Sequence, residues 1–432
     1  MTKRMLLAIL LLIVFALPAG CQKQGGEPTQ PTAPAPTILP TPTPEPSPTP
    51  TPDPVGEALA GMTVEQKAAQ LLVAGIEGTE PGEDAVQAVQ GYQVGGVILF
   101  GRNVESAEQL AALTNGLKEL NGDYTPLFLC VDQEGGRVDR MPPEVSRTPS
   151  AWSVGQTLDT EGVGVSYGEL LAAECAAFGF NMDFAPSLDI WSNPENTVIG
   201  DRAFGTDAAT VTGAANETAL GILSGGVIPV AKHFPGHGDT AVDSHYGLPV
   251  VDKSLEELEE LELRPFRQAI DTTCVYGTYG GDTSIPAIMV AHILLSQIDP
   301  DNPASLSPEV VTGLLREEMG YEGVVCTDDL TMGAISNTYG MGEAAVLAVE
   351  AGCDLLLVCH GADNLAEAHA ALVEAVDSGC IPEERLDESV YRVLSLKTVY
   401  GLSNAPVEAP DIEALNDRIA ALERSIEADT SQ

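Results

Sequence analysis

Short apolar stretches alternate with helix-like stretches eight times along this chain, between about residue 56 and residue 402. The apolar stretches have the length of buried strands and cover residues 71–76, 95–100, 127–132, 182–189, 228–233, 287–293, 324–328 and 355–359. Between them lie helix-compatible segments that include residues 105–120, 165–178, 208–224, 254–270, 308–318, 341–351 and 364–379. Because strands that alternate with helices pair in parallel, the pattern predicts an α/β fold, a (β/α)8 barrel of the TIM type formed by a single domain. A doubly wound open sheet is the alternative, since counting strands does not prove that the sheet closes.

Polar residues gather at the C-terminal ends of these predicted strands. They are Asp132, Asp189, Lys232, His233, His292, Asp328 and Asp329. In a barrel the C-terminal ends of all the strands meet on one face, where barrel enzymes carry their active sites. This convergence predicts an enzyme, with a catalytic barrel that spans residues 55–403.

The first twenty residues have the composition of a secretion signal. Lys3 and Arg4 form a positive start, and residues 6–17 form an apolar core that is short for a membrane span. The following Leu17-Pro18-Ala19-Gly20-Cys21 resembles the signal of a bacterial lipoprotein, although Pro18 replaces the usual aliphatic residue. We therefore expect residues 1–20 to be a removed signal peptide, and Cys21 to carry a lipid that anchors the protein to the bacterial cell membrane, outside the cytoplasm. The alternative is a plain cleaved signal peptide, which would leave the protein secreted.

Residues 21–54 link this anchor to the barrel. Residues 22–54 contain twelve Pro among Thr, Ala and Ser, a composition that does not bury a core. Such a segment favours polyproline II, and at about 3.1 Å per residue it reaches on the order of 100 Å. We expect it to hold the domain away from the membrane surface.

The C-terminal segment, residues 404–432, is acidic but carries one apolar helical stripe. Ile412, Leu415, Ile419, Leu422 and Ile426 recur every three or four residues. We expect this helix to pack on the outside of the barrel. Self-association through the helix is the alternative, but two heptads are marginal for a coiled coil, so a monomer is expected.

The charge balance disfavours several classes of partner. Twenty Lys and Arg against 63 Asp and Glu give a net charge of −43, which argues against nucleic acid and against direct binding to anionic lipid. Seven Cys follow Cys21 without any C-x-x-C pair, so neither a zinc site nor a disulfide framework is indicated. We expect no metal and no cofactor, and membrane association through the lipid anchor only.

The densest group of titratable residues follows the predicted strand at 228–233. The run Lys232-His233-Phe234-Pro235-Gly236-His237-Gly238-Asp239-Thr240, continued by Asp243-Ser244-His245, contains three of the six His in the chain. Three further motifs are Asp132-Gln133-Glu134-Gly135-Gly136-Arg137-Val138-Asp139-Arg140, Val198-Ile199-Gly200-Asp201-Arg202-Ala203-Phe204-Gly205 and Thr327-Asp328-Asp329-Leu330-Thr331-Met332. Together the four motifs resemble glycoside hydrolase family 3, in its β-N-acetylhexosaminidase branch, over about residues 56–402.

This resemblance implies a retaining mechanism, in which a carboxylate attacks the sugar and forms a covalent glycosyl-enzyme. It assigns Asp328 as the nucleophile. Side chains alternate along a strand, so Asp329 points the other way and is expected to be a hydrogen-bonded support, although spacing alone does not choose between the two. The resemblance also assigns His245 as the acid/base and Asp243 as the carboxylate that orients it. A His with an unperturbed pKa near ~6.5 both donates and accepts protons near neutrality.

The same resemblance places five residues against the substrate: Asp132, Arg140, Arg202, Lys232 and His233. The Asp can accept hydrogen bonds from sugar hydroxyls, and the other four can donate to hydroxyl or acyl oxygens.

Four neighbouring residues are expected to be structural. Glu134 and Arg137 are predicted to form an internal ion pair, and His237 and Asp239 to brace the loop that carries His245. His292 is left open between a core-lining role and a place in the site wall.

The implied substrate is a β-N-acetylglucosaminide. For an exported lipoprotein this points to muropeptide fragments of peptidoglycan, from which terminal N-acetylglucosamine would be released. One alternative is a phosphorylase, because a His proton donor lacks the negative charge that repels phosphate. The other is a cell-surface glycan-binding lipoprotein without turnover, which would not require intact Asp328, Asp243 and His245.

Overall fold

A computed structural model describes residues 53–157, 162–240, 243–271, 274–275, 282–283 and 285–430. The expected signal peptide and the linker up to residue 52, including Cys21, lie outside the described residues. Eight parallel strands close into a barrel in the order β1, β2, β3, β4, β5, β9, β11 and β12, with β12 pairing back to β1. The predicted barrel is therefore confirmed, and the open sheet is wrong.

The barrel strands all lie within or overlap the predicted ranges. They are β1 (Leu72–Gly75), β2 (Gly96–Ile98), β3 (Phe128–Val131), β4 (Met182–Asp183), β5 (Ile228–Phe234), β9 (Ala287–Val290), β11 (Val324–Asp329) and β12 (Leu355–Val358). The strand expected over residues 182–189 ends at Asp183, but single backbone hydrogen bonds to the neighbouring strands continue beyond it, such as Phe184 N to Val131 O at 2.8 Å and Lys232 N to Pro186 O at 3.1 Å. Pro186 has no N–H to donate, so the pairing in this stretch is irregular.

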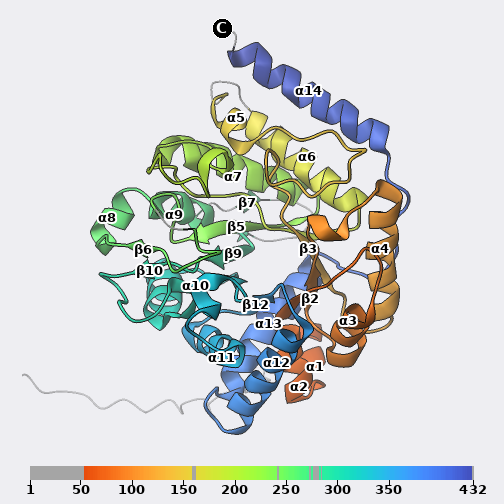
Figure 1. Cartoon of the computed structure of the whole chain (residues 1–432), viewed down its shortest axis with the longest axis vertical. Helices are drawn as coiled ribbons and strands as arrows, with labels where there is room; N and C mark the ends of the chain where they lie inside the picture. The colour runs from red at the N-terminus through yellow and green to blue at the C-terminus, as the bar shows by residue number, and fades with distance from the viewer. Residues whose placement is uncertain are drawn as a thin grey trace, which may run out of the picture. The chain divides into compact units, whose positions relative to one another are not determined.

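Helices surround the barrel strands (Figure 1). They are α1 (Pro54–Ala60), α2 (Val64–Gln70), α3 (Glu83–Val86), η1 (Gln87–Tyr92), η2 (Gly101–Asn103), α4 (Ala107–Asn121), α5 (Ala151–Gly155), α6 (Val163–Ala177), η3 (Gly200–Arg202), α7 (Ala208–Ser224), α8 (Leu255–Glu260), α9 (Leu263–Asp271), η4 (Ala304–Leu306), η5 (Glu309–Glu318), α10 (Gly333–Ser336), α11 (Met341–Ala351), α12 (Ala362–Asp377), α13 (Glu383–Val399) and α14 (Ile412–Thr430). Several begin at side-chain caps; the Asp207 carboxylate, for example, accepts the N–H groups of Ala209 and Thr210 at the start of α7. Two short pairs lie outside the barrel: β6 (Val250–Val251) with β10 (Leu294–Leu295), and β7 (Cys274–Val275) with β8 (Asp282–Thr283).

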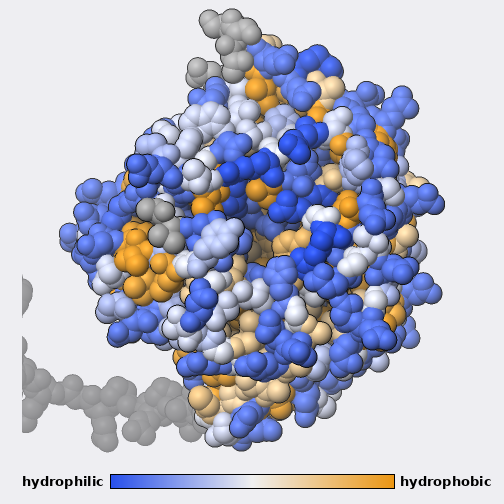
Figure 2. Space-filling view, viewed as in Figure 1, coloured by the Kyte–Doolittle hydropathy of each residue, from blue (hydrophilic) through white to orange (hydrophobic). Residues whose placement is uncertain are grey.

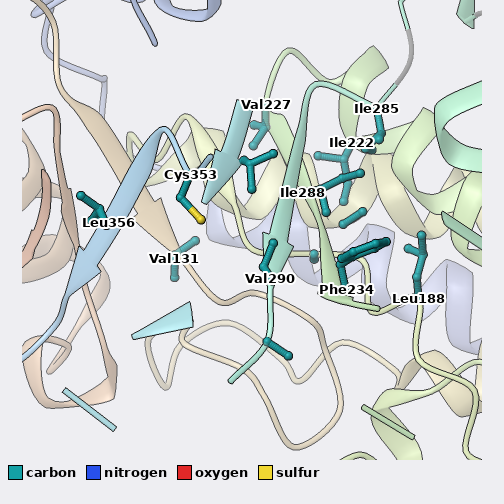
Figure 3. Packing of buried hydrophobic residues seen from close by; sticks show 14 of the residues in the cluster. Val131, Leu188, Ile222, Val227, Phe234, Ile285, Ile288, Val290, Cys353 and Leu356 are labelled. Carbon is teal, nitrogen blue, oxygen red and sulfur yellow. The ribbon is translucent and has the colours of Figure 1, made fainter. Parts of the chain in front are cut away.

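Because side chains alternate along each strand, the barrel has two apolar layers. The outer layer packs against the helices; Figure 3 shows part of it, with Ile288 and Val290 on β9 close to Phe234 on β5. The inner layer fills the barrel with residues such as Phe128 and Met289.

The C-terminal part of α13 reaches this inner layer at the N-terminal ends of the strands. Val393 and Leu396 pack with the inner residues. The buried Lys397 Nζ donates to Gly95 O at 2.8 Å and to Gln70 Oε1 at 2.9 Å. This end of the barrel is therefore closed by side chains.

The C-terminal helix α14 packs against α6, as Figure 1 shows, so the predicted packing of its stripe on the barrel's exterior is confirmed. Leu415, Ile419, Leu422 and Ile426 are buried. The face seen in Figure 2 is mainly hydrophilic, in keeping with the excess of acidic residues. Among the described residues, none of the helices combines the length and the apolar character that crossing a membrane requires.

Candidate active site

A pocket of about 210 Å³ opens at the C-terminal ends of the barrel strands. Apolar side chains form its walls, among them Ile98, Phe100, Phe184, Met289, Met332 and Leu357. Its polar lining consists of Asp132, Glu134, Arg140, Arg202, Lys232, His233, His237, Ser244, His245, Asp328, Asp329 and His360. All the residues predicted to touch the substrate, and both residues predicted to react, therefore line one pocket.

Asp328 and Asp329 end β11 and differ in how their carboxylates are engaged. Both oxygens of Asp329 accept hydrogen bonds, from the N–H groups of Thr331 and Cys359 and from the Thr331 hydroxyl. For Asp328, the described residues supply one donor, the Asp329 N–H at 2.8 Å from Oδ1. Asp328 thus keeps oxygen lone pairs for a ligand, whereas Asp329 is the predicted hydrogen-bonded support. Both residues line the pocket, so the expectation that Asp329 points the other way is wrong.

The environment of Asp328 favours its ionised form. Burial opposes ionisation, but the nearby His292, His233 and Lys232 and the Asp329 N–H together hold the pKa of Asp328 below its ordinary value. Asp328 is therefore a carboxylate at neutral pH, the state that a nucleophile requires.

His245 lies on the loop after β5, and its side chain is 64% exposed. Its Nδ1 lies 2.8 Å from Asp243 Oδ1, which also accepts the His245 N–H at 2.9 Å. Partial burial opposes ionisation of Asp243, but these contacts with His245 outweigh it and lower the pKa of Asp243. An ionised Asp243 fixes the proton on Nδ1, so Nε2 is the nitrogen left to exchange a proton with a substrate. Asp243 itself does not line the pocket.

Four of the five substrate-binding candidates, all except Arg140, are connected through Glu134 by a continuous chain of polar contacts. Lys232 Nζ lies 2.6 Å from both Asp132 Oδ1 and Glu134 Oε1. Arg202 binds Glu134 through two bonds of 2.8 Å. Burial would raise the pKa of Glu134, but Arg202 and Lys232 outweigh it and hold that pKa well below its ordinary value.

His233 continues this chain on the far side of Arg202. Arg202 Nη2 lies 3.3 Å from His233 Nε2, and His233 Nδ1 lies 2.6 Å from Asp189 Oδ2. The ionised Asp189 has only acceptor oxygens, so His233 Nδ1 donates to it. The contacts with Asp189 and Arg202 together fix the orientation of the His233 ring.

The prediction that Glu134 pairs with Arg137 is wrong. Arg137 instead binds Asp201 at 2.9 Å and donates to the carbonyl oxygens of residues 197–199. The residues lie only three positions apart, but the turn after Glu134 bridges Gly135 to Val138 and separates their side chains. Glu134 is consequently part of the pocket.

Arg140 is held differently from the other cations. The described residues supply no hydrogen-bond partner for its buried Nε, and Nη1 makes only a 3.4 Å contact with Asp139 O. A buried guanidinium nitrogen without a partner costs free energy that a bound acceptor recovers. Among the Lys and Arg residues that line the pocket, Arg140 is therefore the one with the fewest protein partners.

Two other histidines stabilise the surroundings of the site. His237 braces the His245 loop, as predicted, with Nδ1 at 2.7 Å from Thr240 Oγ1 and Nε2 at 3.2 Å from Ser244 Oγ. Burial, followed by the charge of His233, lowers the pKa of His237 to about 4, so it is neutral. His292 is fully buried between Ser305 Oγ and Asp329 O, which decides its open role in favour of the core.

Asp239, the other predicted brace, forms an ion pair with Lys253 at 2.8 Å. Among the described residues, no group of three or more His, Cys, Asp or Glu side chains is arranged to hold a metal ion.

Comparison with known proteins identifies the family. The model of the N-terminal domain of glycosyl hydrolase family 3 matches residues 63–396. The chain belongs to this family. The membership predicted from the four motifs is confirmed, and with it the prediction that the chain is a glycoside hydrolase.

Relatives of this family 3 chain include two proteins named beta-hexosaminidases. It is 33% identical over 332 residues to beta-hexosaminidase A of Pseudoalteromonas piscicida, covering 74% of this chain but 56% of that protein. It is 34% identical over 331 residues to a beta-hexosaminidase of Nitrosomonas eutropha, covering 75% of this chain and 91% of the relative. Among solved structures, it resembles a family 3 β-N-acetylglucosaminidase from a Paenibacillus strain with a TM-score of 0.78 and 40% identity, over 84% of this chain and 69% of that one.

The family 3 motifs do not cover every residue of the pocket. His360 also lines it, 54% exposed, with its ring stacked on Phe100 at 5.7 Å between centroids. His360 follows the apolar stretch at 355–359 as Asp132 follows β3. The pattern of polar residues at the C-terminal ends of the predicted strands therefore includes His360 as well. Ser244 and Glu134 lie inside the motifs, but no local signal separates them from structural residues.

Proposed function

We propose that this chain is a retaining β-N-acetylhexosaminidase that releases terminal N-acetylglucosamine from β-linked glycans. The observation that carries the proposal is the meeting, in one pocket, of the ionised Asp328 and of His245 bound at Nδ1 by Asp243. A carboxylate nucleophile and a separate proton donor are what a retaining glycosidase requires. The beta-hexosaminidase relatives and the Paenibacillus β-N-acetylglucosaminidase support the sugar preference.

In the first step, Asp328 attacks the anomeric carbon while His245 Nε2–H protonates the glycosidic oxygen. The bond from carbon to the leaving oxygen breaks as the bond to the Asp328 carboxylate forms, which gives a covalent glycosyl-enzyme. The His245 ring must be doubly protonated to donate. The adjacent Asp243 carboxylate stabilises that cation and keeps Nε2 directed outward.

In the second step, the neutral His245 accepts a proton from water at Nε2. The water oxygen attacks the anomeric carbon and releases the Asp328 carboxylate, so the enzyme returns to its starting state. A His performs both steps near neutrality without the burial that a carboxylic acid needs to raise its pKa.

The pocket suits a single sugar ring at the end of a chain. Its volume of about 210 Å³ lies below the roughly 300–1,000 Å³ of sites for drug-sized ligands. Asp132 can accept hydrogen bonds from ring hydroxyls, and Arg140 offers the donor without a partner described above. Because the pocket has room for one sugar ring, we propose that the enzyme removes one terminal residue at a time.

The test is hydrolysis of aryl β-N-acetylglucosaminide and aryl β-glucoside by the soluble domain, with and without phosphate. We expect release from the N-acetylglucosaminide, free sugar as the product in both buffers, and no turnover by Asp328→Asn. A sugar 1-phosphate formed with phosphate would favour the phosphorylase instead. Binding without release would favour the glycan-binding protein.

We also propose that the enzyme is an exported lipoprotein that acts on peptidoglycan fragments as a monomer. The supporting features are the signal-like residues 1–20, Cys21 and the Pro-rich spacer that follows. Mass spectrometry of the mature N-terminus should find a lipid on Cys21, and Cys21→Ser should move the protein from the membrane fraction to the medium. Muropeptides that carry terminal N-acetylglucosamine should lose it to the wild-type enzyme, whereas an unchanged muropeptide would contradict the assigned substrate.

A further inference from the structure

The loop that carries His245 is attached to the chain segment that directly follows β11. Three successive carbonyl groups of the loop accept hydrogen bonds from this segment. Ser244 O accepts from Ala334 N at 3.0 Å, His245 O from Gly333 N at 3.2 Å, and Tyr246 O from Asn337 Nδ2 at 3.2 Å. The donors begin five residues after Asp328, so one short stretch of chain connects the nucleophile to the support of the acid/base.

The position of the His245 ring depends on this attachment. The ring is 64% exposed, so packing does not hold it. Its side-chain partner Asp243 belongs to the same loop and orients the ring within the loop, without placing the loop relative to Asp328. The contact of Ser244 Oγ with His237 Nε2 at 3.2 Å joins it to the first part of the same loop, just after β5, and not to β11.

Gly333 permits the close contact between the two segments. A Cβ atom at this position would lie 2.7 Å from His245 O and 3.1 Å from the Tyr246 carbonyl carbon. The backbone of Gly333 does not have the positive φ that would itself require glycine. The absence of a side chain is therefore needed for the loop to approach, and an alanine would push the loop away without straining its own backbone.

We propose that Gly333 and Asn337 are positioning residues, which set the distance between the acid/base and the nucleophile. The proposal rests on the proposed function of Asp328 and His245. Loosening the attachment impairs protonation of the leaving oxygen while leaving the carboxylate attack intact. The loss should therefore depend on how much the leaving group needs a proton.

The experiment measures kcat/KM of Gly333→Ala and Asn337→Asp for aryl β-N-acetylglucosaminides whose phenols range from strongly to weakly acidic. The aspartate has the shape of asparagine but cannot donate to Tyr246 O. For the least acidic phenol we expect a loss of about three- to tenfold for Asn337→Asp, the effect of one hydrogen bond, and a larger loss for Gly333→Ala. For the most acidic phenol both variants should stay within about twofold of wild type.

Two matched variants control for the chemical changes. Gly313→Ala adds the same methyl group in a helix where the nearest atom is Pro308 O at 3.7 Å. Asn404→Asp removes the same kind of donor outside the pocket, where Nδ2 donates to Gly122 O at 2.8 Å and to Tyr124 O at 3.2 Å. Both controls should match wild type with every leaving group.

Equal losses for all leaving groups, or no loss in Asn337→Asp, would overturn the positioning role. If Gly333→Ala fails to fold, Asn337→Asp still decides, because it changes an exposed and isosteric side chain. Failure of the proposed function has a different signature, since Asp328→Asn would then keep its activity.

Discussion

The replacement Glu134→Gln tests the most consequential contact that the structure revealed. It keeps the shape of the side chain but removes the charge that faces both Arg202 and Lys232. Removing one partner of a buried ion pair costs about 3–5 kcal/mol, because the other charge stays buried without compensation. Lys232 keeps Asp132 at 2.6 Å, and the Arg202 side chain remains 13% exposed, so we expect the lower end, about 3 kcal/mol.

The assay is urea unfolding at pH 7, followed by circular dichroism and compared with Asp201→Asn. The pair of Asp201 with Arg137 has the same chemistry, but its side chains are 48% and 41% exposed, so its loss should cost under about 1 kcal/mol. Activity should also fall in Glu134→Gln, because both cations line the pocket.

A double-mutant cycle identifies the partner of Glu134. Combined with Arg202→Met, Glu134→Gln should show a coupling free energy above about 1 kcal/mol, and combined with Arg137→Met a value near zero. Similar unfolding free energies for Glu134→Gln and Asp201→Asn, or strong coupling to Arg137, would refute the reasoning.

Three further predictions concern buried groups outside the pocket. Burial, against hydrogen bonds from Thr148 and Gln133, raises the pKa of Glu174 to about 8, so the folded protein retains a proton that the unfolded chain loses near pH 4.5. The unfolding free energy should fall as pH rises from about 4.5 to 8, and Glu174→Gln should remove about 4–5 kcal/mol of that fall. Unfolding titrations at several pH values measure this, and parallel curves of unfolding free energy against pH for wild type and variant would contradict the prediction. Burial lowers the pKa of Lys397 to about 7, so here the unfolded chain holds a proton that the folded protein loses, and stability should rise between about pH 7 and 10. Lys397→Met should lack about 4 kcal/mol of this rise. An unchanged pH dependence in the variant would mean that Lys397 is not buried as described. Ile419→Ala should lower the unfolding free energy by about 2–4 kcal/mol without changing the sedimentation coefficient, because Ile419 is fully buried in a helix that packs on α6; a change in oligomeric state would instead favour self-association.

The sequence by itself determined the barrel and the contents of its active face. Each barrel strand is an apolar stretch, and the period of side chains along a strand is set by neighbouring residues, so it can be read locally. The titratable residues that end these stretches, such as Asp132 and Asp328, converge because parallel strands present their C-terminal ends on one side. His360 could have been predicted by the same rule. The apolar stripe of residues 412–426 similarly predicted the packing of α14.

Only the tertiary structure decided which charges pair and how the reacting groups are held. Glu134 lies three residues from Arg137 in sequence, yet it binds Arg202, 68 residues away, because the turn after Glu134 separates the nearer pair. The attachment of the His245 loop to Gly333 and Asn337 likewise joins segments about ninety residues apart through backbone carbonyls. Ionic and hydrogen-bond partners depend on distances of a few ångströms between distant parts of the chain. Those distances arise only when the barrel closes.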